Sequence, residues 1–337
     1  MMQKSIEICR DVSMIFDDVL EIKNGRNQRA VENPNGKYPI YGSGGIMGYA
    51  DDYICDAETV IVGRKGSINN PIFVNEKFWN VDTAFGLQAN KELLLPRYLY
   101  YFCKNFDFER LNKAVTIPSL TKSDLLKIEI NLPGLKEQQD IVNKLLKIEK
   151  IINLRQQKLN ELEELIKARF VELFYDKGYP VLKWNDVFNT TTGKLDSNAA
   201  VEDGEYPFFT CSKEALRIDK FAYDQKALLL AGNNAAGKYD VKYYKGKFNA
   251  YQRTYVLGLK EDWSYQLFRY QLEDKLVYLQ QQSLGGLTKY LTMKILGELD
   301  FIIPPMEKQI EFEEFAKQVD KSKVIVMKIE DKLNMLY

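Results

Sequence analysis

The sequence predicts an α+β protein: two pseudo-symmetric mixed α/β domains separated by an antiparallel coiled-coil pair of long helices. Length, an internal repeat and two segments with coiled-coil spacing lead to this expectation. The 337 residues exceed one ordinary domain and suit two, each large enough for its own core. With 45% hydrophobic and 28% charged residues, the composition is that of a folded globular protein.

The chain repeats itself at a separation of about 170 residues. Short matches occur in the same order in both halves, and their separation drifts by only a few residues. The matches are Asp18-Val19 with Asp186-Val187, Gly25 with Gly193, Tyr38-Pro39 with Tyr206-Pro207, residues 60–63 with 229–232, Leu120-Thr121 with Leu291-Thr292, residues 131–133 with 302–304, and Glu137 and Gln139 with Glu307 and Gln309. One such match could occur by chance, but an ordered series indicates a duplicated unit with loop insertions.

Each unit begins with short β-rich runs and Gly, Asn or Pro turns, followed by a long helix. In the first helix apolar residues recur in alternating steps of four and three, which is the spacing of a coiled-coil seam. They are Ile141, Leu145, Ile148, Ile152, Leu159, Leu162, Ile166 and Leu173, with Arg155 and Arg169 at two skipped positions. The second helix keeps the rhythm with Phe312, Phe315, Val319, Val326, Ile329, Leu333 and Leu336, and Ser322 takes its skipped position.

Two exposed apolar seams must be buried, and each helix is the simplest partner for the other, which gives an antiparallel pair. At 1.5 Å per residue, the first helix forms a rod about 60 Å long. The alternative is that each helix packs separately on its own domain. Pro133 and Pro304 precede the helices, and Gly178 and Pro180 end the first one. The predicted boundaries are residues 1–134 for the first domain, 135–178 for its helix, 179–305 for the second domain and 306–337 for its helix.

Composition excludes several classes of function. The chain has no histidine, so it lacks the commonest general base and zinc ligand. Four widely separated cysteines indicate free thiols in a reducing compartment. No secretory signal and no apolar run of about 20 residues is present, so we expect a cytoplasmic protein without a membrane partner. Because the net charge is zero, any nucleic-acid contact must come from local clusters.

The sequence contains no complete catalytic signature. Residues 232–238 fit the first positions of a P-loop, but Tyr239 stands where Ser or Thr should hold magnesium, and a strand-like run follows instead of a helix. A dinucleotide fingerprint and clustered metal ligands are also missing from the sequence. Residues 303–306 lack the polar and aromatic residues of an adenine-methyltransferase motif. We therefore expect a chain that is not an enzyme and that holds no cofactor or metal.

The loops after two hydrophobic strands are the strongest candidates for a binding site. Residues 63–70 and 232–238 occupy equivalent places in the repeat, and both combine glycine with amide and basic side chains. Such side chains pair with guanine and adenine edges, and glycine lets the backbone approach phosphate. A polar surface hairpin is the alternative interpretation.

A cationic run lies beside the second of these loops. Residues 238–253 contain five cations and only one acid, Asp240, and the cations are interleaved with tyrosines, as phosphate positioning requires. A solvated face of a β-ribbon would look the same.

Adding two matching turns, at residues 41–45 and 210–212, completes the set of candidate DNA-contacting residues. It comprises Tyr41, Ser43, Arg64, Lys65, Ser67, Asn69, Lys113, Thr210, Ser212, Asn233, Asn234, Lys238, Tyr239, Lys242, Gln252, Arg253 and Lys289.

With these features the chain resembles the specificity subunit of type I restriction–modification systems over nearly its whole length. The telling segments are residues 38–43, 60–67, 117–121 and the helix entry at 131–142, with weaker forms in the second copy. The resemblance implies two target-recognition domains, each reading one half of a split, asymmetric site in double-stranded DNA. It also implies two modification subunits that bind S-adenosylmethionine and methylate adenine, and restriction subunits that use ATP and magnesium. The second helix, from Glu307, is shorter than the first, which departs from perfect pseudo-symmetry.

Half-sites read from one face of DNA should lie about one helical turn apart, roughly 34–36 Å, which the predicted rod can span. A structural adaptor whose domains bind proteins is the alternative function, and a histidine-free nuclease or methyltransferase comes third. Steeply salt-dependent, sequence-selective binding would favour the DNA reader over the adaptor. Methyl transfer by the chain alone would favour the enzyme.

Overall fold

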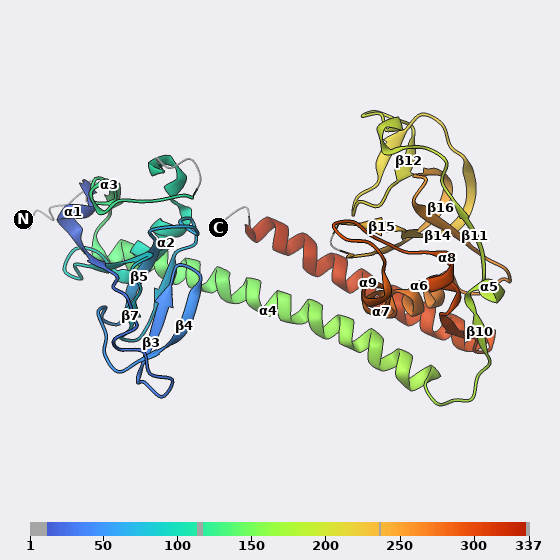
Figure 1. Cartoon of the computed structure of the whole chain (residues 1–337), viewed down its shortest axis with the longest axis horizontal. Coiled ribbons are helices and arrows are strands. Elements are labelled where there is room, and N and C mark those ends of the chain that lie inside the picture. Colours follow the sequence, from blue (N-terminus) through green and yellow to red (C-terminus); the bar gives the residue numbers. More distant parts are fainter. Residues whose placement is uncertain (1–11, 113–116, 236, 335–337) are drawn as a thin grey trace, which may run out of the picture. The chain divides into compact units, whose positions relative to one another are not determined.

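The computed structural model describes residues 12–112, 117–235 and 237–334, with side chains in the last helix described as far as Met327 (Figure 1). The chain divides between Asn153 and Leu154 into two compact parts, which we call unit 1 and unit 2.

The described residues of unit 1 form three small sheets and the first half of a long helix. Strand β1 (Val12–Ile15) pairs with β9 (Glu129–Leu132). A four-stranded sheet has the order β2 (Leu20–Asn24), β8 (Ala84–Ala89), β5 (Thr59–Gly63), β6 (Ile72–Val74), and a three-stranded sheet has the order β4 (Gly45–Ala50), β3 (Tyr38–Gly42), β7 (Trp79–Asn80). The helices are α1 (Phe16–Val19), α2 (Pro96–Asn105), η1 (Phe108–Leu111), α3 (Lys122–Leu125) and α4 (Leu135–Phe174).

Unit 2 repeats this order of elements. Strand β10 (Val181–Lys183) pairs with β19 (Asp300–Ile302), and β15 (Asn233–Asn234) pairs with β18 (Lys289–Tyr290). The main sheet has the order β11 (Phe188–Thr192), β17 (Thr254–Leu259), β14 (Tyr223–Ala231), β16 (Val241–Ala250), β12 (Tyr206–Phe209), β13 (Leu216–Ile218). The helices are α5 (Trp184–Val187), η2 (Ser197–Ala199), α6 (Tyr265–Asp274), α7 (Leu276–Gln282), α8 (Met293–Gly297) and α9 (Met306–Asn334).

The two units therefore confirm the predicted duplication of a mixed α/β domain followed by a long helix. One difference was not predicted: the two larger sheets of unit 1 are one six-stranded sheet in unit 2. Strand β16 causes it, because its ten residues pair with β14 at one end and in parallel with β12 at the other. In unit 1 the shorter strands β6 and β7 share these two tasks.

A central strand buried on both faces anchors each unit. In β5, Val60 and Val62 join one core cluster, while Ile61 between them joins another on the opposite face. In β14, Leu228 and Leu230 alternate with Leu229 in the same way. Because side chains of a strand alternate between faces, a continuous apolar run marks a strand with no solvent-facing side. The loops that follow these strands are consequently held by the most buried part of each unit.

Within unit 2 the second half of α4 runs antiparallel to α9, as the seams predicted. Contacts pair later residues of α4 with earlier residues of α9: Arg169 with Glu311 at 2.5 Å, Glu163 with Lys323 at 3.8 Å, and Arg155 with the carbonyl of Val326 at 3.4 Å. The buried core of the pair consists of Leu162, Ile166, Leu173 and Phe174 with Phe312, Ala316 and Val319. The side chains of Ile329, Leu333 and Leu336 lie outside the described residues.

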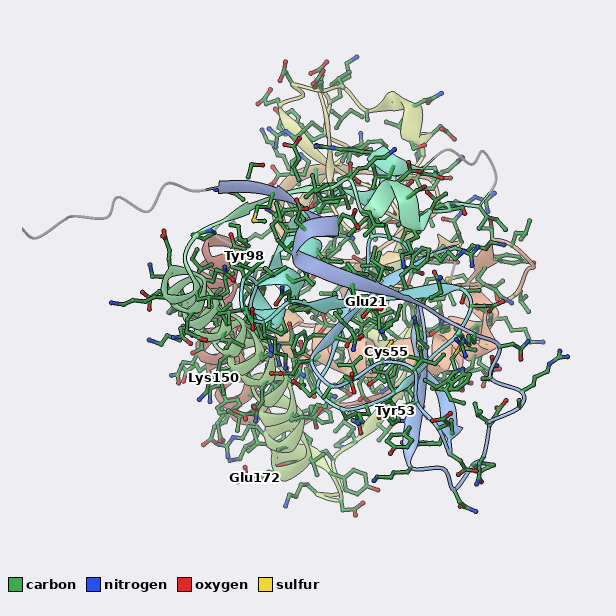
Figure 2. All side chains as sticks on the ribbon, turned by 90° about the vertical axis from the view of Figure 1, so that its left-hand side faces the viewer. Glu21, Tyr53, Cys55, Tyr98, Lys150 and Glu172 are labelled. Carbon is green, nitrogen blue, oxygen red and sulfur yellow. The ribbon has the colours of Figure 1, made fainter. Side chains whose placement is uncertain are left out.

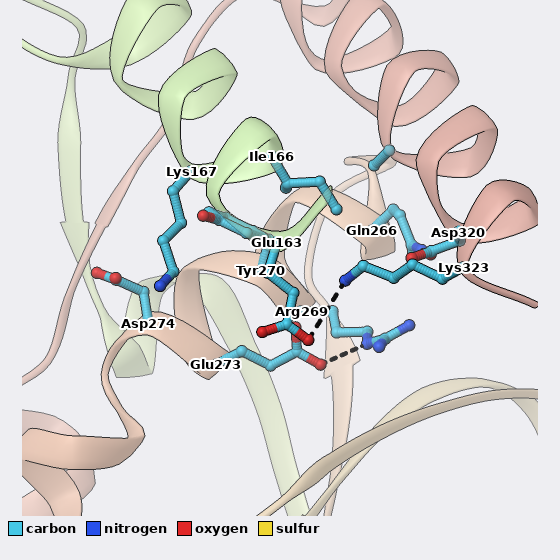
Figure 3. A pocket seen from close by; sticks show the side chains of 11 residues that line it. Glu163, Ile166, Lys167, Gln266, Arg269, Tyr270, Glu273, Asp274, Asp320 and Lys323 are labelled. Carbon is cyan, nitrogen blue, oxygen red and sulfur yellow. Dashed lines mark hydrogen bonds and ion pairs between the residues drawn. The ribbon is translucent and has the colours of Figure 1, made fainter. Parts of the chain in front are cut away.

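A pocket lies where α4, α6 and α9 meet in unit 2 (Figure 3). Its charged groups bind one another: Arg269 contacts Glu273 at 2.7 Å, and Lys323 contacts Glu163. Burial raises the pKa of the Glu273 carboxyl, although Arg269 beside it acts in the opposite direction. The Lys323–Glu163 pair links α9 to α4, and the Arg269–Glu273 pair lies within α6, so these charged groups take part in the packing of the three helices.

Candidate nucleic-acid interface

In unit 1 three segments that lie far apart in the sequence meet at the loop that follows β5. The amide of Leu120 donates to the carbonyl of Arg64 at 2.9 Å, and the amide of Gly66 donates to Pro118 at 3.1 Å. The hydroxyl of Ser43, from the turn after β3, donates to the carbonyl of Lys65 at 3.4 Å. Backbone contacts thus fix the loop, while the side chains of Arg64, Lys65 and Ser67 remain exposed.

The side chains of Asn69 and Tyr41 make contacts that stabilise this group of loops. The amide side chain of Asn69 donates to Asp107 at 3.1 Å and accepts from the backbone of Phe108 at 2.7 Å, which ties the loop to η1. The half-buried ring of Tyr41 packs edge-on against Phe78. Burial, and to a smaller extent the Glu76 carboxylate, raise the pKa of the Tyr41 hydroxyl above its ordinary value. Lys113 lies outside the described residues.

Unit 2 builds its loop in the same way after β14. The amide of Gly232 donates to Arg253 at 2.8 Å, and the amide of Leu291 donates to Gly232 at 2.8 Å. Asn234 then faces Lys289 in the short ladder of β15 and β18, just as Lys65 faces Ser119 in unit 1. The two loops, which the repeat placed in register, therefore occupy the same position in both units.

Close backbone approach explains why both loops begin with glycine. A Cβ atom at Gly63 would lie 2.2 Å from the carbonyl oxygen of Ser67, and one at Gly232 would lie 2.4 Å from that of Arg253. The sequence also predicted that residues 232–238 do not form a P-loop. The structure confirms this, because the segment leads into strand β16 and not into a helix.

The remaining candidates of unit 2 lie in different surroundings. Lys238, Arg253 and Gln252 are exposed, and Gln252 contacts Asp196 at 3.2 Å. Lys242 forms an ion pair with Asp240 and donates to the carbonyl of Ser212 at 2.9 Å. These contacts bring the turn at residues 210–212 next to β16. The cations further along β16, Lys245 and Lys247, face Lys226 and Asp224 towards the other end of the strand, so the cationic run is not one compact patch.

Two candidates have side chains that are too buried for contact with DNA. Tyr239 is 7% exposed and belongs to the same core cluster as Val241 and Leu291. Its ring shares a strand face with Val241, because residues two apart in extended chain point to the same side. Thr210 is also 7% exposed, and its hydroxyl is hydrogen-bonded to that of Ser212 at 2.7 Å. We therefore remove both from the set of direct contacts.

Sequence reasoning also missed two exposed apolar residues beside the loops. Ile117 is 61% exposed and precedes Pro118, whose carbonyl binds Gly66. Leu287 is 95% exposed and stands two residues before Lys289 of β18. A signal was available, because each is an aliphatic residue between glycine, proline or polar residues, where a core position is not expected.

Three further structural features concern membrane helices, metal ligands and cysteines. Among the described residues, none of the helices has the length and apolar character needed to cross a bilayer. In the same part of the chain, no group of three or more histidine, cysteine, aspartate or glutamate side chains is arranged to hold a metal ion. Cys55, Cys103 and Cys211 are free thiols, as their spacing predicted, and Cys9 lies outside the described residues.

Comparison with known proteins gives consistent matches over both units. Residues 13–164 and 177–335 each match the family model described as the type I restriction modification DNA specificity domain. The chain is 35% identical over 134 residues to the type I restriction enzyme EcoDI specificity subunit of Escherichia coli, covering 39% of this chain and 29% of that protein. It is 31% identical over 144 residues to a putative type I specificity subunit of Mycoplasma pneumoniae, covering 40% of this chain and 47% of the relative. Each match thus spans less than half of the relative's length.

Solved structures share the fold. The S subunit of a type I restriction–modification system from M. genitalium has a TM-score of 0.63 at 18% identity, covering 98% of this chain and 96% of that chain. A chain from a structure described as the basis of complex assembly and conformational transition of the type I R-M system has a TM-score of 0.55 at 16% identity, covering 96% and 95%.

Proposed function

We propose, from the premise that the chain belongs to the family of type I restriction modification DNA specificity domains, that it reads a bipartite, asymmetric DNA site. Unit 1 reads one half of the site and unit 2 reads the other. The chain itself performs no chemistry, and positions adenine methyltransferase subunits at the site that it has selected. It acts in the cytoplasm on double-stranded DNA.

The observation that carries this proposal is the equivalent loop in both units. Each loop follows a strand buried on both faces and is fixed by backbone hydrogen bonds. The two loops differ in their side chains: the exposed Arg64, Lys65 and Ser67 in unit 1, and the half-buried Asn233 and Asn234 with the exposed Lys238 in unit 2. A rigid scaffold with variable reading residues suits two different half-sites, because base identity is read by side-chain donors and acceptors in the groove.

Assembly with two modification subunits, and with restriction subunits, is part of the proposal. S-adenosylmethionine, ATP and magnesium would be held by those partners. Support comes from unit 1, where Tyr98, Tyr101, Phe102 and Phe106 line an open groove with Ile141 and Leu145 of α4. Tyr98 is labelled in Figure 2. The long helices also expose apolar side chains outside their seam, among them Leu154, Leu165 and Ile325. Exposed apolar surface of this kind suits a subunit of a larger assembly.

Co-expression with the cognate methyltransferase genes, followed by mapping of methylated adenines across the genome, tests the function. We expect one split motif. The double variant R64A/K65A should weaken binding of purified complex to that motif by about tenfold or more and lower the salt dependence, since it removes phosphate or base contacts. Lys91→Ala is the control, because Lys91 forms an exposed pair with Glu58 away from the loop. Unmethylated DNA, or equal effects of both variants, would contradict the proposal.

The length of the helical pair should set the number of unread base pairs between the half-sites. Inserting seven residues after Lys158 and seven after Lys328 lengthens both helices near the level where Arg155 meets Val326. The insertion adds about 10 Å, equivalent to about three base pairs, so the methylated motif should gain a longer spacer. Insertion into α4 alone should abolish methylation, because it shifts the seam of one helix only. An unchanged spacer in the double insertion would show that the helices do not measure distance.

A further inference from the structure

Leu287 stands at the tip of a short loop with almost its whole side chain in solvent. Its exposure of 95% exceeds that of every other described large hydrophobic residue. The loop is closed at its base by two backbone hydrogen bonds between Leu284 and Tyr290, of 3.0 and 2.9 Å. Gly285 adopts a φ of +100°, which a residue with a side chain rarely does, so the loop turns sharply to present Leu287.

This tip is attached directly to the proposed reading loop of unit 2. Lys289, two residues after Leu287, pairs with Asn234 across β18 and β15. The Lys289 side chain also packs beside Gly237: a Cβ atom added at Gly237 would lie 3.3 Å from the Cγ atom of Lys289. The tip that carries Leu287 is therefore joined to a ladder of amide and lysine residues, side chains of the kind that bind bases and phosphates.

Unit 1 repeats the arrangement. Ile117 is 61% exposed, and the residues after it, Pro118 and Ser119, pair with the loop that carries Lys65 and Gly66. A single exposed aliphatic residue is ordinary on a protein surface. Two of them, in equivalent loops of two diverged units and next to the same cationic strand end, call for a common explanation.

We propose that Leu287 and Ile117 are apolar wedges that enter the DNA duplex and part a base step, one wedge in each half-site. This inference rests on the proposed function. Aliphatic side chains inserted between base steps partly unstack the bases, and the added contacts between protein and DNA offset the cost. A methyltransferase must extrude its target base from the stack, and extrusion is easier where stacking is already disturbed. The wedges would thus prepare each half-site for the modification subunit that acts there.

The test uses the complex of the full chain with its modification subunits, bound to duplexes that carry the mapped motif with 2-aminopurine at successive positions of both half-sites. The fluorescence of this base analogue rises when it loses its stacking partner. For the wild-type chain we expect a severalfold rise at one step in each half-site. Leu287→Ser should remove the rise in one half-site only, and Ile117→Ser should remove it in the other only.

Two further variants separate the wedge from other effects. Leu287→Met keeps a long apolar side chain and should retain the rise. Val181→Ser changes an exposed aliphatic residue of β10, 54% exposed and remote in sequence from the loop, and should leave both half-sites unchanged. If the wild-type complex binds its motif and the rise persists in Leu287→Ser, the wedge is refuted and the proposed function stands. If the wild-type complex shows no preference for any DNA sequence, the proposed function fails and the wedge fails with it.

Discussion

Replacing Gln138 by alanine should lower the free energy of unfolding of unit 1 by about 4 kcal/mol, because one buried and two part-buried hydrogen bonds to backbone groups would be lost, at about 1–3 kcal/mol each. Gln138 is fully buried at the start of α4. Its side-chain oxygen accepts from the amide of Leu95 at 2.8 Å, and its nitrogen donates to the carbonyls of Leu93 and Pro133 at 2.8 Å each. This one side chain therefore ties the helix to the domain that precedes it.

Gln139→Ala is a matched control one residue away. Gln139 is exposed, and its side chain bonds to Asn143 on the same helix face at 3.0 Å. Its loss should change the free energy of unfolding by less than about 0.5 kcal/mol. Urea denaturation of the full chain gives the stability, and hydrogen exchange shows which unit unfolds. Equal effects of the two substitutions would mean that the buried hydrogen bonds contribute nothing in net terms.

Unit 2 contains the same device. Gln309 is 1% exposed at the start of α9, where it accepts from the amide of Ser264 at 2.9 Å and donates to the carbonyl of Pro304 at 2.8 Å. The sequence comparison matched Gln309 with Gln139, and that match is wrong by one residue. Because the two glutamines of unit 1 are adjacent, spacing alone allows either. The phase of the helix decides: Gln138 lies one turn before the buried Val142, so it faces the domain.

Elements marked by periodicity were predictable from the sequence. The apolar run of β5, the seam of α4 with its two arginines, and the position of the reading loops depend on local patterns that persist in the fold. The burial of Tyr239 was also predictable from its local sequence pattern. Its alternation with the exposed Lys238 and the buried Val241 already indicates an inward side chain.

Features that depend on distant partners were not predictable. The side chain of Asn69 is hydrogen-bonded to Asp107 and Phe108, nearly forty residues away. Whether β16 joins two sheets depends on how far its pairing with β14 continues, which involves the whole domain. Nothing in the residues near Asn69 or Val241 reports such long-range contacts, so the structure was required to separate scaffold from reading surface.

The buried glutamines lead to the second large effect: exchanging residues 1–134 for the equivalent segment of another specificity subunit should replace one half of the methylated motif and leave the other half intact. Each unit has its own hydrophobic core, so the recipient half should fold unchanged. The junction should also transfer, because Gln138 and Gln309 bond only to backbone groups. Any donor whose chain passes that point in the same conformation offers the same partners.

Mapping of methylated adenines measures the outcome for the parent, the donor and the hybrid. The hybrid that also carries Gln138→Ala is the stringent control. This variant should lose methylation at the hybrid motif, because its exchanged unit would no longer be fixed to α4. The hybrid without the substitution should retain methylation there. A hybrid motif in which both halves change, or in which the parental motif persists, would show that each half-site is read jointly by the two units. The modular reader inferred from the duplicated loops would then be untenable.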